Sequence, residues 1–254
     1  MKLSVIIPAY NEAKRIESCL QSLFAALQGT VRPNVTAEVI VVDNNSTDNT
    51  AELARRADAH VVFEPFNQIA RARNAGADVA TGDWFLFVDA DTLVSSETMT
   101  DLLAAIENGR FVGGSAEIYF GPIGPAIRVL VALGNFLIRS FKLTAGCFVF
   151  CRADAFRDFG GFNEAMFAGE DAELGKSMKR WGRGKGLRIA ILREHPPLTS
   201  KRKLELYRPR ELAVLLFRYL LFPKRTVRNK SQLQVFYDGS MDRNGMHRSA
   251  FAGR

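Results

Sequence analysis

Apolar runs alternate with polar segments along the first 92 residues. Four runs have the composition of strands buried in a parallel sheet, and they lie at 3–8, 38–43, 60–63 and 83–91. Between them, apolar residues recur at helical spacing or follow helix-capping residues, which predicts helices over about 16–27, 51–57 and 70–80. Strand and helix alternate throughout, so the sequence predicts an α/β fold with a mainly parallel central sheet flanked by helices.

Polar residues follow these predicted strands. Tyr10, Asn11 and Glu12 come after the first strand, Asp43 ends the second, and the fourth ends in Asp89-Ala90-Asp91. Ligands of parallel sheets bind beyond the carboxyl ends of the strands, where these side chains would collect. Two carboxylates in close proximity resist ionisation unless a cation compensates, and Mg2+ and Mn2+ prefer oxygen ligands. The pattern indicates a divalent metal site, and a solvated acidic turn is the alternative.

Six motifs, in this order, resemble glycosyltransferase family 2. They are VIIPAYNE at 5–12, VVDNNSTDNT at 41–50, ARNAG at 72–76, VDAD at 88–91, TAGCFVF at 144–150 and GED at 169–171. The resemblance covers roughly residues 1–200 and implies a GT-A fold, with a Rossmann-like nucleotide-sugar-binding half at 1–92 and an acceptor-binding, catalytic half at 93–200. It also implies metal-assisted transfer, with inversion, from a UDP- or GDP-linked sugar to a saccharide or lipid-linked acceptor.

The resemblance also assigns residues. Asp171 would be the general base with Glu170 beside it, and Asp91 and His195 would bind the metal. The expected contacts of the nucleotide sugar are Pro8, Tyr10, Glu12, Asp43, Arg73, Asp89, Ala90 and Gly146. Arg71 and Arg73 are two positions apart on a helix, so only one of them should reach the nucleotide, and the family pattern selects Arg73.

Each of these roles has a structural alternative. Tyr10 could cover the core instead of stacking on a nucleobase, and Asp43 could close a turn. Gly146 could be a simple bulge, and Glu170 and Asp171 could serve only as acids at the start of a helix. His195 is an isolated histidine after a predicted strand at 187–192, and such a residue is more often structural than catalytic.

Basic residues and two apolar segments characterise the rest of the chain. The formal net charge is +7, and basic residues crowd a C-terminal extension, 201–254, which we expect to be partly helical. Two apolar segments with basic residues, at 123–143 and 212–222, are interrupted or too short to span a bilayer. They suit either an interfacial helix on an anionic membrane or a core or homodimer contact. Residues 200–202 could meet phosphate if this extension folds over the donor.

Three cysteines are too few for a disulfide framework, and Lys2 is the only basic residue before the first strand. We therefore expect a cytoplasmic protein, peripheral at the inner face of the membrane, without a signal peptide. Three alternatives remain. A retaining transferase of the same fold is one. A nucleotidyltransferase would need a glycine-rich basic loop where this chain has Ala9-Tyr10-Asn11-Glu12. A nucleic-acid-binding protein would explain the charge but not the clustered carboxylates, so we expect no nucleic-acid partner.

Overall fold

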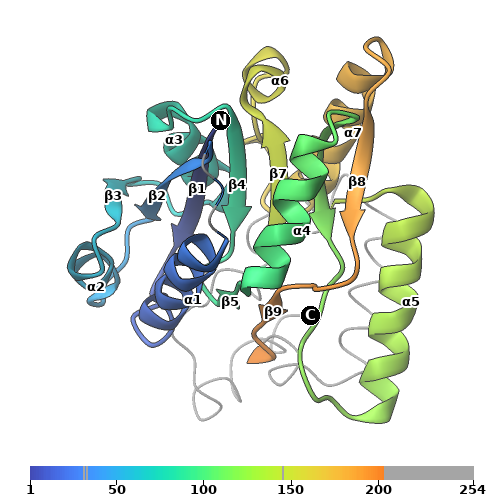
Figure 1. Cartoon of the computed structure of the whole chain (residues 1–254). Helices are drawn as coiled ribbons and strands as arrows, with labels where there is room; N and C mark the ends of the chain where they lie inside the picture. Colours follow the sequence, from blue (N-terminus) through green and yellow to red (C-terminus); the bar gives the residue numbers. More distant parts are fainter. Residues whose placement is uncertain (31, 33, 145, 203–254) are drawn as a thin grey trace, which may run out of the picture.

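The computed structural model describes residues 1–30, 32, 34–144 and 146–202. Seven of their strands form one mixed sheet in the order β3-β2-β1-β4-β7-β6-β8 (Figure 1). These strands are β1 (Lys2–Ala9), β2 (Thr36–Asp43), β3 (His60–Phe63), β4 (Trp84–Val88), β6 (Phe111–Ala116), β7 (Phe148–Arg152) and β8 (Arg188–Leu192). Within this sheet β7 runs antiparallel to β4 and β6, and the other pairs are parallel. The predicted α/β class with a mainly parallel sheet is confirmed.

Helices cover both faces of the sheet. Successive residues of β1 point to opposite faces, so Val5 and Ile7 join one hydrophobic cluster and Ile6 joins the other. The first cluster includes residues of α1 (Ile16–Gly29), α2 (Thr50–Arg56) and α4 (Ser96–Glu107). The second includes residues of α3 (Ile69–Val79), α6 (Ala153–Asp158) and α7 (Glu170–Arg183). The core therefore lies in two layers, one on each side of the sheet.

Two further elements lie outside these layers. A short ribbon pairs β5 (Thr92–Leu93) with β9 (Leu198–Thr199), and it brings the segment after the Asp89-Ala90-Asp91 motif next to the segment after β8. The helix α5 (Pro125–Phe141) stands at the β8 side of the molecule (Figure 1). The apolar run predicted at 212–222 lies outside the described residues, as does most of the predicted extension.

Candidate active site

The loops after β1 and β2 are held together at the carboxyl edge of the sheet. The backbone N–H of Asn11 donates to Ser46 Oγ at 3.1 Å, and Asn11 Oδ1 accepts from the N–H of Thr47 at 2.8 Å. The N–H of Glu12 donates to Thr50 Oγ1 at 2.9 Å. Asn11 has φ 52°, in the left-handed region that asparagine tolerates better than most residues. These bonds fix the backbone that presents Tyr10 and Glu12.

Glu12 connects this loop to the end of the described chain. Its carboxylate is buried and accepts from Arg202 Nη2 at 2.7 Å and from Arg15 Nη1 at 3.2 Å. The β5–β9 ribbon leads the chain to Arg202, so a residue 190 positions away lies over the β1–α1 loop. The basic run at 201–203 was a signal for a polar contact, but nothing local pointed to Glu12 as the partner.

The other predicted donor contacts of the first strands lie at the same edge. Asp43 is buried at the end of β2, and its Oδ1 accepts from the N–H of Ser46 at 3.0 Å, so the turn role is present in the structure. Pro8 is buried within β1 opposite Val42, and Tyr10 is half-buried. Their contacts with a nucleotide remain predictions.

Arg73 joins three segments that are far apart in the sequence. Its side chain on α3 is 1% exposed, and its Nη1 lies 2.7 Å from Glu170 Oε1. Its Nη2 donates to Asp89 Oδ1 at 3.0 Å and to the carbonyl oxygen of Gly146 at 2.9 Å. The guanidinium also lies over the ring of Phe162, 5.1 Å from its centroid. We call Arg73 with Asp89, Gly146 and Glu170 the Arg73 junction.

Arg71, two positions earlier, faces the surface. Its side chain is 40% exposed and pairs with Glu64 at 3.3 Å and Glu164 at 3.2 Å. The expectation that the two arginines lie on different faces of the helix is therefore confirmed. Arg73 is buried, however, and its acceptors are protein groups, which favours positioning of the site over direct contact with a nucleotide.

Asp171 lies next to the Arg73 junction. Burial and the charge of the neighbouring Glu170 raise the pKa of Asp171 to about 7, against the opposing effect of Arg73. Thr144 Oγ1 donates to the carbonyl oxygen of Asp171, and a Cβ added to Gly146 would lie 3.0 Å from Asp171 Oδ2. The bare backbone of Gly146 thus permits close contact with this carboxyl. A carboxyl group that titrates near neutral pH is suited to general base catalysis.

Asp91 belongs to the same acidic edge. Its side chain is half-buried immediately before β5. Burial, followed by the charge of Asp91, raises the pKa of Cys19 to about 12, and Asp89 and Glu12 act in the same direction. All three carboxylates are thus near enough to affect the Cys19 thiol, while Glu12 is paired with Arg202 and Arg15, and Asp89 with Arg73. Ala90, between Asp89 and Asp91, is buried.

His195, the second predicted metal ligand, contacts α4 in this structure. Its Nδ1 is 3.1 Å from Asp101 Oδ2 on α4, and its carbonyl oxygen accepts from Thr98 Oγ1 at 2.8 Å. In the antiparallel β5–β9 ribbon, Thr92 lies opposite Thr199 and Leu93 opposite Leu198. Asp91 and His195 therefore lie toward opposite ends of this ribbon. Among the described residues, the potential metal ligands that cluster with His195 are Asp101 and Glu194.

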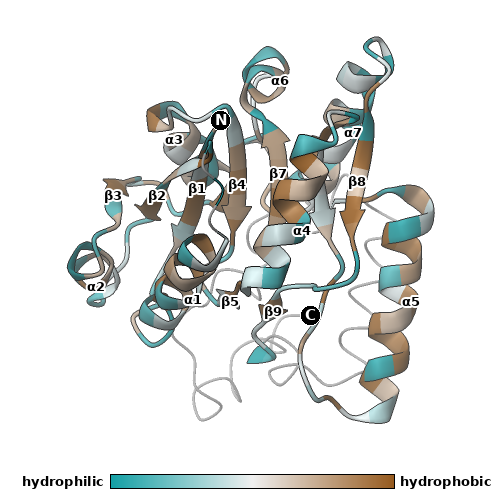
Figure 2. Ribbon diagram, in the orientation of Figure 1, coloured by the Kyte–Doolittle hydropathy of each residue, from teal (hydrophilic) through white to brown (hydrophobic). Residues whose placement is uncertain are grey.

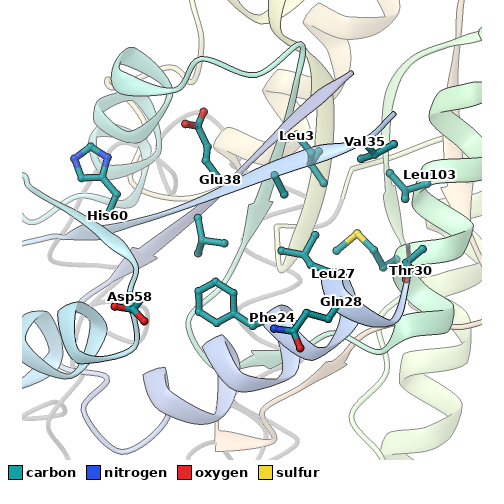
Figure 3. A pocket seen from close by; sticks show the side chains of 13 residues that line it. Leu3, Phe24, Leu27, Gln28, Thr30, Val35, Glu38, Asp58, His60 and Leu103 are labelled. Atoms are coloured by element: carbon teal, nitrogen blue, oxygen red, sulfur yellow. The ribbon is translucent and has the colours of Figure 1, made fainter. Parts of the chain in front are cut away.

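A separate pocket of about 500 Å³ lies at the opposite edge of the sheet (Figure 3). Leu3 at the start of β1, Phe24 and Leu27 of α1, and His60 at the start of β3 line it. None of the predicted site residues borders this pocket. The carboxyl edge, with its paired carboxylates and the Arg73 junction, remains the candidate active site.

Solved structures of similar fold include glycosyltransferases. The mannosyltransferase PcManGT of Pyrobaculum calidifontis, in complex with GDP-Man and Mn2+, gives a TM-score of 0.64 at 20% identity, over 93% of this chain and 69% of that one. TarS of S. aureus, in complex with UDP-GlcNAc, gives a TM-score of 0.61 at 25% identity, over 80% of this chain and 59% of that one. The sheet with its acidic carboxyl edge is that of a GT-A fold.

Sequence comparison gives the family. Residues 4–164 match the model described as Glycosyl transferase family 2, and the chain belongs to this family of transferases. It is 30% identical over 188 residues to the glycosyltransferase AglE of Haloferax volcanii, which covers 68% of this chain and 60% of the relative. It is 32% identical over 154 residues to the dolichol-phosphate mannosyltransferase of Pyrococcus furiosus, over 56% of this chain and 42% of the relative. The chain thus matches less than two thirds of the length of these relatives.

Proposed function

We propose that this chain transfers a sugar from a nucleotide diphosphate to an acceptor hydroxyl, with inversion at the anomeric carbon. The observation that carries this proposal is the Arg73 junction, in which one buried guanidinium binds both Asp89 at the end of β4 and Glu170 at the start of α7. A donor-side carboxylate and the acids of α7 are thereby held in one rigid network. The complexes of similar proteins with GDP-Man and UDP-GlcNAc support this class of donor.

The donor would lie along the carboxyl ends of β1, β2 and β4. In this proposal Tyr10 stacks on the nucleobase, Asp43 accepts from the base or ribose, and Asp89 contacts the ribose. Pro8, Glu12, Ala90 and Gly146 complete the wall of the donor site. Arg73 acts as a positioning residue beneath it. Residues 1–92 would bind the donor, and 93–200 would bind the acceptor and carry the base.

A divalent cation, Mg2+ or Mn2+, would suit the carboxylate that follows β4. Asp91, half-buried immediately before β5, offers the kind of oxygen ligand that such ions prefer. Asp89 and Glu12 are paired with arginines. We propose Asp91 as a ligand. When bound, the cation would neutralise charge on the departing diphosphate. His195 stays a predicted second ligand, although its ring partner here is Asp101.

Inversion by a single displacement needs a base on the face of the sugar opposite the leaving group. Asp171 suits that role, because its pKa of about 7 lets it hold and release a proton near neutral pH. Glu170 Oε1 is paired with Arg73 Nη1 at 2.7 Å, and this residue would orient the start of α7.

Matched variants test this assignment. Asp171→Asn keeps the size of the side chain and removes its basicity, so transfer should fall by about 10²–10⁴-fold while UDP or GDP affinity stays near wild type. Glu170→Gln should affect transfer less. Near-normal transfer by Asp171→Asn together with a collapse in Glu170→Gln would move the base to Glu170. Full activity of both variants would exclude the proposed mechanism.

The expected membrane contact and the expected homodimer also remain proposals. They differ in what would cover the exposed apolar side chains of α5. Among the described helices, none has the length and apolar character needed to cross a bilayer.

A further inference from the structure

The helix α5 presents an apolar face to the outside of the molecule. Of its 17 residues only Ile138 is buried. The exposed large apolar side chains are Val129, Leu130, Leu133, Phe136, Leu137 and Phe141. Figure 2 shows hydrophobic residues along this helix at the edge of the fold. Their spacing of three and four positions places them in one stripe, which we call the outer face of α5.

Polar contacts hold the helix in this orientation. Asn135 lies on the inner side of the helix. Its Oδ1 accepts a hydrogen bond from the N–H of Ile118 at 2.9 Å, and its Nδ2 donates to the carbonyl oxygen of the same residue at 2.9 Å. Arg139 pairs with Glu117 at 3.4 Å, and Lys179 Nζ on α7 donates to the carbonyl oxygen of Phe141 at 2.6 Å. A surface helix ordinarily turns its leucines inward and its asparagine outward. In α5 the leucines point outward and the asparagine points inward, so we expect the outer face to meet an apolar environment.

The charges of α5 indicate which surroundings fit. The helix carries Arg128 and is followed by Lys142, its other arginine, Arg139, is paired with Glu117, and its sequence contains no acidic residue. An apolar stripe with basic residues at its margin is the pattern of helices that lie in the headgroup region of an anionic membrane. A second copy of the chain would bring a like-charged helix against the same surface.

We propose that the outer face of α5 docks on an anionic lipid surface. The helix ends at Phe141, and Thr144 and Gly146 follow closely. Thr144 donates to the carbonyl oxygen of Asp171, and a Cβ on Gly146 would lie 3.0 Å from Asp171 Oδ2. A membrane against α5 would therefore lie near the proposed base. This places a lipid-borne acceptor within reach of the site, a consequence that rests on the proposed function, whereas docking itself does not.

Vesicle cosedimentation of the full chain, without nucleotide sugar, tests docking apart from catalysis. The chain should bind vesicles that contain phosphatidylglycerol and should bind pure phosphatidylcholine at least about tenfold more weakly. High salt should release it, because the lipid charge is then screened. Absence of binding to phosphatidylglycerol at low salt would overturn the proposal. Lost sugar transfer with intact vesicle binding would count against the proposed function alone.

Two phenylalanines provide a matched pair of variants. Phe136 on α5 is 55% exposed, and Phe63 on β3, at the other edge of the sheet, is 58% exposed. Phe136→Glu should weaken vesicle binding by at least about tenfold, because a charge enters the apolar stripe, whereas Phe63→Glu should leave binding unchanged. Equal binding by both variants and the wild type would overturn the assignment to α5, since basic residues elsewhere would then be sufficient.

Charge reversal and oligomeric state separate lipid from other occupants of this face. The double variant Arg128→Glu with Lys142→Glu leaves the apolar stripe intact and should still lose vesicle binding about tenfold. Sedimentation velocity of the same proteins reports self-association. A dimer that Phe136→Glu dissociates, with vesicle binding unchanged, would assign the face to a second copy. Lower thermal stability of Phe136→Glu with unchanged vesicle binding would assign it to the chain's own residues 203–254. Either result would overturn lipid docking.

Discussion

Arg73 Nη1 lies 2.7 Å from Glu170 Oε1, although the two residues are 97 positions apart in the sequence. Their side chains are 1% and 6% exposed, so the pair ties α3 to the first residue of α7 inside the protein. A buried ion pair contributes little net stability when it is intact, but loss of one partner leaves an uncompensated charge in the interior. The same contact therefore fixes the acids at the start of α7 and makes the fold depend on both residues.

Arg73→Met should lower the free energy of unfolding by about 3–5 kcal/mol, because Glu170 and Asp89 would lose their shared cation. Arg71→Met, in the same helix, removes an exposed arginine and should cost only about 0–1 kcal/mol. Urea denaturation of both variants measures the difference. Similar losses for the two would mean that the burial of Arg73 does not govern its contribution.

The local patterns of the sequence were sufficient for the first four strands of the sheet and their polar ends, although the strand predicted at 83–91 is shorter, Trp84–Val88. The strand predicted at 60–63 has the observed bounds. The strand predicted at 38–43 ends at Asp43 as expected and begins two residues earlier than predicted, at Thr36. Because parallel strands end at one edge, Asp43 and Asp89 could be brought together without knowledge of the tertiary structure. Short, continuous apolar runs followed by polar residues carry this information within a few positions.

Contacts between distant segments were beyond these patterns. No periodicity indicates that Arg73 is buried against Glu170, or that Arg202 pairs with Glu12. His195 follows its strand as expected, but the β5–β9 register, which no local motif encodes, directs it to Asp101. Each of these outcomes depends on which segments meet in space, and the sequence of either segment alone does not specify its partner.

The raised pKa of Asp171 predicts a pH-dependent stability. An unfolded aspartate has a pKa of about 3.9, whereas folded Asp171 titrates at about 7. Between these values the folded chain keeps the proton that the unfolded chain has lost, so this group lowers stability as the pH rises, and its effect is constant above about pH 7. Asp171→Asn cannot ionise. Its stability advantage over wild type should grow between about pH 5 and pH 7 and then level, at on the order of a few kcal/mol.

Asp154→Asn is the control for that titration. The hydrogen bond from Arg152 lowers the pKa of Asp154, so both states of this group are ionised above about pH 5. Its effect on stability should not change between about pH 5 and pH 8. Urea denaturation at several pH values measures the unfolding free energies of the variants. A pH-independent difference between Asp171→Asn and wild type would show that the surroundings do not raise the pKa of Asp171.

The proposed metal site predicts that nucleotide binding depends on a divalent cation. UDP or GDP affinity should rise when Mn2+ or Mg2+ is added, because the diphosphate otherwise meets the negative charge of the Asp91 carboxylate directly. Asp91→Ala should abolish this increase. His195→Ala should reduce it less, since the ring binds Asp101 in the described structure. Calorimetric titration with metal and with chelator measures these differences, and equal wild-type affinity in both would exclude the site.

Gly146 provides a test of how closely the proposed base must be held. A Cβ at this position would lie 3.0 Å from Asp171 Oδ2 and 3.4 Å from Arg73 Nη2. Gly146→Ala should therefore displace the carboxyl by a few tenths of an ångström, and transfer should fall by roughly ten- to a hundredfold. Gly184→Ala, at the far end of α7, meets nothing within 4 Å and should leave transfer near wild type.

The pH profile distinguishes displacement of the base from general disruption of the site. The added methyl group of Gly146→Ala would bring apolar surface against the Asp171 carboxyl, which disfavours its charged form. The pKa of Asp171 should rise further, so the pH at which transfer reaches half its maximum should move upward from about 7. A lower maximal rate with an unchanged midpoint would mean that the substituted residue disturbs acceptor binding and that Asp171 does not govern the profile.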